Sequence, residues 1–130
     1  VTSITLHYLG KSKNKFKGIS CTETWLNVER MDEIQMEGYE LHFVNRINKR
    51  GGGVALYINS DFKCKVVGEM TMIVDNVMEM VTVEMSNDIA KNIIINCVYR
   101  ALGSCIRIFT DKIIELVDYI KNKTLFMCRD

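Results

Sequence analysis

The stretch "NIIINCVYR", residues 92–100, is an apolar run that ends on a tyrosine and an arginine. Such a run is typical of a strand covered on both faces, because a strand with one face in water alternates apolar and polar residues. A strand of this kind belongs to a sheet with a layer on each side. We therefore expect a mixed α/β fold in which Tyr99 and Arg100 stand at the carboxyl end of a buried strand.

Further strands are expected on both sides of this segment. In "GGGVALYIN" (51–59), Val54, Leu56 and Ile58 lie on one face, and Ala55 and Tyr57 lie on the other. Polar residues at 59–61 predict a hairpin turn into the next strand. The full set of expected strands covers residues 17–21, 39–45, 51–59, 62–67, 77–85, 92–99 and 124–128.

Two segments are expected to form helices. Residues 105–121, with Ser104 as the N-cap, repeat apolar residues at helical spacing, and residues 3–16 form a weaker candidate. Strands joined by crossover helices predict a sandwich or a three-layer arrangement. The helix should pack on the sheet through Phe109, Ile113, Leu116 and Ile120, and the expected strand core comprises Ile19, Val54, Leu56, Ile58, Ile93, Ile95, Val98, Leu125 and Met127.

Length and composition limit the class of protein. At 130 residues the chain is one domain or part of one, and its first residue, Val1, indicates a start inside a longer chain. The net charge of +1 gives no bulk attraction to nucleic acid or to a membrane, and no apolar run is long enough to span a bilayer. Five cysteines without a CxxC pair indicate free thiols in a reducing intracellular compartment. A zinc site is not expected, because His7 and His42 are near no cysteine pair in the sequence.

Polar residues suited to metal chemistry follow three of the expected strands. Glu23 comes shortly after 17–21, Tyr99 closes the strand at 92–99, and Asp130 comes shortly after 124–128. Ligand sites of open α/β sheets lie beyond the carboxyl ends of strands, and carboxylate and phenol oxygens suit Mg²⁺. The alternative for each position is an ordinary solvated residue at a strand end.

The order of three motifs favours the metal site. "ETWL" (23–26), "RGGGVALYI" (50–58) and "VYR" (98–100) resemble the endonuclease/exonuclease/phosphatase family, and within it most the endonuclease domain of LINE-type (non-LTR) retrotransposons. The resemblance extends from about Phe16 to Asp130. It implies a two-sheet sandwich flanked by helices, with the active site at one rim.

The resemblance also implies roles for individual residues. Glu23 corresponds to the ligand of the catalytic Mg²⁺ (or Mn²⁺), Tyr99 to the tyrosine that positions the scissile phosphate, and Asp130 to the aspartate that acts on the attacking water. Arg46 and Arg100 match family arginines suited to phosphate contact, and Arg50 lies in the adjacent basic loop. The implied partner is DNA, and the implied location is the nucleus.

Several family positions differ or are absent. An upstream catalytic Asn, the Asn two places after Asp130 and the terminal Ser-Asp-His are not in the chain, and Ala101 and Arg129 replace the family's Pro and Gly. We therefore expect residues 1–130 to be an incomplete endonuclease domain from a reverse transcriptase polyprotein, without nicking activity by itself. The alternative is a domesticated, non-catalytic module that binds nucleic acid or protein.

Overall fold

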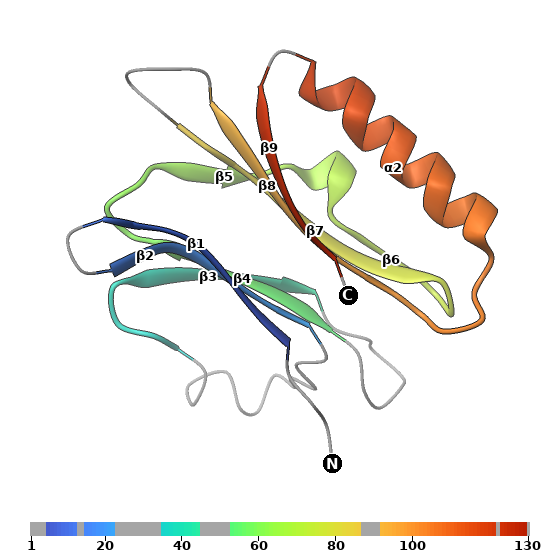
Figure 1. The fold of residues 1–130 in the computed structure, drawn as a ribbon, viewed down its shortest axis with the longest axis horizontal. Coiled ribbons are helices and arrows are strands. Elements are labelled where there is room, and N and C mark those ends of the chain that lie inside the picture. Colours follow the sequence, from blue (N-terminus) through green and yellow to red (C-terminus); the bar gives the residue numbers. More distant parts are fainter. Residues whose placement is uncertain are drawn as a thin grey trace.

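The chain forms a mixed α/β structure with two β-sheets and one α-helix among the residues described (Figure 1). The computed structural model describes residues 5–12, 15–22, 35–44, 53–86, 92–121 and 123–129. The expected α/β class is confirmed at this level. Within the described residues, no helix is long and apolar enough to cross a membrane.

The first sheet has four antiparallel strands in the order β1-β2-β4-β3. Their bounds are Thr5–Ser12 (β1), Lys15–Thr22 (β2), Tyr39–Val44 (β3) and Val54–Asn59 (β4). The helix expected at 3–16 is wrong, because residues 5–12 pair with β2 from Thr5↔Thr22 to Ser12↔Lys15. When the helical periodicity of a segment is weak, pairing with a neighbouring strand determines its secondary structure.

The second sheet contains the strand from which the sequence analysis began. Its order is β5-β7-β8-β9, with the short strand β6 also paired to β7. Strands β8 and β9 are parallel, and α2 provides the crossover that a parallel pair requires. The bounds are Cys64–Val66 (β5), Met72–Val74 (β6), Met78–Met85 (β7), Ile93–Arg100 (β8), Ile106–Ile120 (α2) and Thr124–Arg129 (β9), and a 3₁₀ turn covers Gly68–Met70.

Apolar side chains fill the spaces on both faces of the second sheet. The inter-sheet cluster includes Leu56, Val81 and Ile95, and it joins the two sheets face to face. The helix-side cluster includes Ile94 and the buried face of α2, which covers the opposite face of the second sheet (Figure 1). Strand β8 is therefore covered on both faces, as its composition indicates.

Most of the expected core positions are buried, with exceptions near the edges. On α2, Phe109, Leu116 and Ile120 are buried and Ile113 is half-buried against the helix-side cluster. The prediction for Met127 is wrong, since it is 37% exposed. The reason is that β9 is the last strand of its sheet. Ile93 and Leu125 are half-buried rather than buried.

Two local predictions also need correction. Asn59 begins a turn, because Asp61 N–H donates to its Oδ1 (2.9 Å) and Phe62 N–H donates to its carbonyl oxygen (3.0 Å). This turn is not a hairpin, since β4 belongs to the first sheet and β5 pairs with β7 of the second. The N-cap of α2 is Cys105 rather than Ser104.

Candidate functional site

Three strands end at one edge of the molecule. Thr22, the last residue of β2, pairs with Val54, and the preceding Gly53 donates its N–H to Oε1 of Glu79 on β7 over 3.4 Å. Glu79 pairs in turn with Tyr99 on β8. Strand β9 runs parallel to β8, with its last residue, Arg129, level with Val98.

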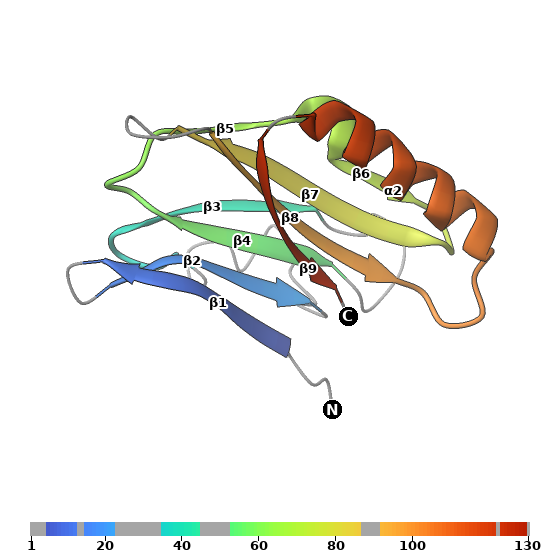
Figure 2. The same ribbon diagram turned by 45° about the horizontal axis from the view of Figure 1, so that its top comes forward.

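Figure 2 shows the arrowheads of β2, β8 and β9 pointing toward the same side of the molecule. We call this region the strand-end edge and define it by Thr22, Gly53, Glu79, Tyr99 and Arg129. Both sheets contribute to it, so residues that are far apart in the sequence meet there.

The structure describes only some of the candidate site residues. Tyr99 lies at the strand-end edge. Glu23, Asp130, Arg46 and Arg50 lie outside the described residues. In the sequence, Glu23 follows Thr22 and Asp130 follows Arg129, and both of these preceding residues belong to the edge.

Tyr99 and Arg100 lie on opposite faces of β8. Tyr99 is half-buried and packs against the inter-sheet cluster. Arg100 is directed to the helix side, where its Nε donates to Ser104 Oγ and its Nη2 to the Ser104 carbonyl, both over 3.2 Å. Its guanidinium also lies 5.9 Å from the centre of the Phe109 ring. The loop between β8 and α2 therefore holds Arg100 in place.

Glu79 is a buried carboxylate that the sequence analysis did not single out. It is 2% exposed, and it lies directly across from Tyr99 on the face turned toward the first sheet. The available signal was an acidic residue within "VMEMVTVEM", a strand otherwise rich in apolar residues. Buried carboxylates normally accept hydrogen bonds, and one donor to Glu79 is the backbone N–H of Gly53.

The other acidic residue of β7 lies at the opposite end of the strand. Glu84 accepts hydrogen bonds of 2.8 Å from Lys123 Nζ and from Asn92 Nδ2. These bonds, first from Lys123 and then from Asn92, hold the pKa of Glu84 below its usual 4.5. Hydrogen bonding to Glu84 likewise raises the pKa of Lys123. This group links β7 to the starts of β8 and β9 and has a structural role.

The residues that the resemblance assigns to the metal site suit a hard cation. Glu23, Tyr99 and Asp130 offer only oxygen atoms, which are the ligands that Mg²⁺ prefers, and no sulfur or imidazole is among them. Among the described residues, Glu79 pairs with Tyr99 and offers a further carboxylate. The chemistry of the donor set therefore fits the Mg²⁺ that the resemblance implies.

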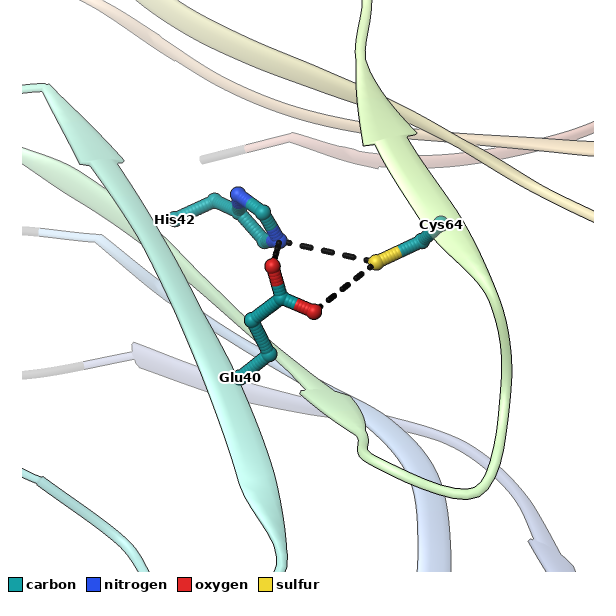
Figure 3. A network of polar contacts seen from close by, with 3 residues as sticks. All are labelled: Glu40, His42 and Cys64. Carbon is teal, nitrogen blue, oxygen red and sulfur yellow. Dashed lines mark hydrogen bonds and ion pairs between the residues drawn. The ribbon is translucent and has the colours of Figure 1, made fainter.

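A second group of possible ligands lies at the edge of the two sheets formed by β3 and β5. Glu40 and His42 of β3 meet Cys64 of β5 (Figure 3). The thiol of Cys64 donates to Glu40 Oε2 over 3.5 Å, and its Sγ lies 3.6 Å from His42 Nε2. Glu40 Oε1 is 3.4 Å from the same His42 nitrogen. Burial, and then the charge and hydrogen bond of Glu40, raise the pKa of the Cys64 thiol to about 11.

A zinc site was not expected from the sequence, because neither histidine is near a cysteine pair along the chain. The structure places His42 beside a single cysteine that is 22 positions away. The only signal in the sequence was the alternation of Glu40 and His42, which puts both on one face of a strand.

Comparisons with known proteins identified no relative: no family model, no curated protein and no solved structure matches the chain.

Proposed function

We propose that the chain has the scaffold of a Mg²⁺-dependent endonuclease that hydrolyses phosphodiester bonds in DNA, of the kind found in LINE-type retrotransposons. The proposed fold is the two-sheet sandwich of the endonuclease/exonuclease/phosphatase family. The observation that carries the proposal is the convergence of β2, β8 and β9 at the strand-end edge. A site of this family needs those three strand ends together.

In the proposed endonuclease, roles fall to Tyr99 of the strand-end edge and to the residues that follow Thr22 and Arg129 in the sequence. Glu23 holds the cation, Tyr99 orients the scissile phosphate, and Asp130 acts on the attacking water. Bound Mg²⁺ supplies Lewis-acid polarisation of a phosphoryl oxygen. The position of Tyr99 against the inter-sheet cluster supports its role, because a phenol packed on a rigid core keeps one orientation.

Contact with the DNA backbone is assigned to Arg46, Arg50 and Arg100. A guanidinium has five N–H donors, and the bonds from Arg100 to Ser104 use two of them. The remaining donors of Arg100 are available for a phosphate. A side chain already held by Ser104 and Phe109 also loses less conformational freedom on binding.

The metal site can be tested without activity, by adding Mn²⁺ to the isotope-labelled chain and recording amide line broadening. We expect the amides of Thr22, Gly53, Tyr99 and Arg129 to broaden first, and excess Mg²⁺ to restore them. Glu23→Gln should remove this effect, and Glu69→Gln, at an exposed position of the 3₁₀ turn, should not. Broadening that is centred elsewhere, or that persists in Glu23→Gln, would refute the site.

DNA binding is the second arm of the same test. Fluorescence anisotropy with a short duplex should show affinity that falls as salt rises, because the contacts are to phosphates. Arg100→Gln should reduce the salt slope by about 1. Arg107→Gln, an exposed control on α2, should leave it unchanged. Salt-independent binding, or no binding at low salt, would refute the assignment to DNA.

A further inference from the structure

Three ligand-type side chains meet where the sheets come together at β3 and β5. Alternation along β3 places Glu40, His42 and Val44 on the face turned toward the second sheet, and Val44 packs in the inter-sheet cluster. The turn that begins at Asn59 carries the chain from the first sheet to the second. Cys64, the first residue of β5, is thereby brought next to β3.

The distances among the three side chains are close to those around a tetrahedral zinc ion, although Glu40 meets Cys64 and His42 through different carboxylate oxygens. Zn–S bonds of about 2.3 Å and Zn–N and Zn–O bonds of about 2.0–2.2 Å place neighbouring ligand atoms about 3.3–3.7 Å apart. The observed separations are 3.6 Å for Cys64 Sγ to His42 Nε2, 3.5 Å for Cys64 Sγ to Glu40 Oε2 and 3.4 Å for His42 Nε2 to Glu40 Oε1. One ligand atom from each residue lies within 4.8 Å of the other two, so an ion can bind after a rotation of the exposed Glu40 carboxylate, with little movement of the two strands.

The arrangement differs from that of a catalytic cysteine triad. In such a triad the acid contacts one imidazole nitrogen and the nucleophile contacts the other. Here both Glu40 and Cys64 approach Nε2 of His42 (Figure 3). Three ligand-type side chains gathered in this way can hold a metal ion.

We propose that Glu40, His42 and Cys64 form a Zn²⁺ site that joins the edge strands of the two sheets. Thiolate and imidazole ligands select zinc over Mg²⁺, Ca²⁺ and Mn²⁺. Three protein ligands leave the fourth tetrahedral position to water. The side chain of Glu40 is 55% exposed and that of His42 only 11%, so the water lies on the Glu40 side.

The zinc site is separate from the strand-end edge. Glu40 pairs with Ile58 and Cys64 pairs with Met85, whereas the strand-end edge lies at Val54 and at Met78, the other ends of β4 and β7. Strands β3 and β5 are also the outer strands of their sheets. Zinc binding therefore clamps the sheets at a site that the proposed nuclease chemistry does not use.

The test is titration of the metal-free chain with Co²⁺ and Zn²⁺ alone. Co²⁺ should bind in a one-to-one ratio with a thiolate-to-cobalt charge-transfer band, and Zn²⁺ should displace it. Cys64→Ser should abolish the band. Loss of a residue that only hydrogen-bonds a metal ligand lowers metal affinity roughly 10–100-fold. His42→Gln removes a ligand itself, so it should weaken Zn²⁺ binding by more than this. At a free Zn²⁺ concentration about 100 times Kd, the melting temperature of the unmodified chain should rise by about 10 °C.

Matched controls separate ligand loss from misfolding. Cys105→Ser changes an exposed cysteine before α2, and His7→Gln changes the other histidine, on the outer strand β1 of the first sheet. Both should bind Zn²⁺ like the unmodified chain. The melting temperature of His42→Gln in chelator should stay within a few degrees of the unmodified chain. No charge-transfer band, or equal Co²⁺ binding by Cys64→Ser, would show that the three residues form only a hydrogen-bonded group.

Discussion

The backbone N–H of Gly53 donates a hydrogen bond of 3.4 Å to the buried carboxylate of Glu79, 26 positions further along the chain. Gly53 enters the first sheet at β4, and Glu79 belongs to β7 of the second sheet. The bond therefore joins the two sheets beside the end of β2 and next to Tyr99.

Gly53→Ala is expected to destabilise the fold. Gly53 has φ of 86°, in the left-handed region where a Cβ costs about 1–2 kcal/mol. Urea denaturation should show a loss of that size or more, because a shift of the backbone also disturbs the bond to Glu79. Gly68→Ala is the matched control, since a Cβ there meets nothing within 4 Å. Equal effects of the two substitutions would contradict a special role for Gly53.

The buried face of α2 should contribute strongly to stability. Leu116 is 0% exposed in the helix-side cluster, so Leu116→Ala should lower the free energy of unfolding by about 2–5 kcal/mol. Ile113→Ala should cost less, because Ile113 is only half-buried. Ile114→Ala, at a position 53% exposed, should stay within about 0.5 kcal/mol of the unmodified chain. A larger loss for Ile114 than for Leu116 would mean that the helix packs through another face.

The Glu84–Lys123 pair predicts a specific loss of stability in acid. The folded-state pKa of Glu84 is below its usual 4.5, so its contribution is present above that pH and disappears as the pH falls through the lowered value. The pKa of Lys123 is raised above its usual 10.5, so Lys123 keeps its charge, and the pair keeps its full contribution to stability, up to pH 10.5. The difference in unfolding free energy between the unmodified chain and Glu84→Gln should therefore be larger at pH 7 than at pH 3.

Glu115→Gln is the control for this pH experiment. Glu115 forms an exposed pair with Lys112 at 3.6 Å, and surface pairs of this kind contribute little. Its difference from the unmodified chain should be small at both pH values. A Glu84→Gln difference that is the same at pH 3 and pH 7 would contradict the role of the Lys123 and Asn92 hydrogen bonds.

Much of the fold could be predicted from local patterns. Strands β3, β4, β7 and β8 were expected within a few residues of their bounds, because two-residue alternation and long apolar runs reflect burial directly. Helix α2 was expected for the same reason, at a period of 3.6 residues. Strand β1 was missed, since its strand state depends on pairing with β2 rather than on its own pattern.

From the sequence alone, most of the buried strands and the buried face of α2 could be predicted, because apolar periodicity is a local property. The folded structure was needed to show that β4 and β5 belong to different sheets, that Glu79 lies across from Tyr99, and that His42 meets Cys64. Each of these relationships joins residues about 20 or more positions apart or depends on the choice of strand partner. Partner choice follows from how the two sheets bury their shared apolar faces together, and no single segment carries that information.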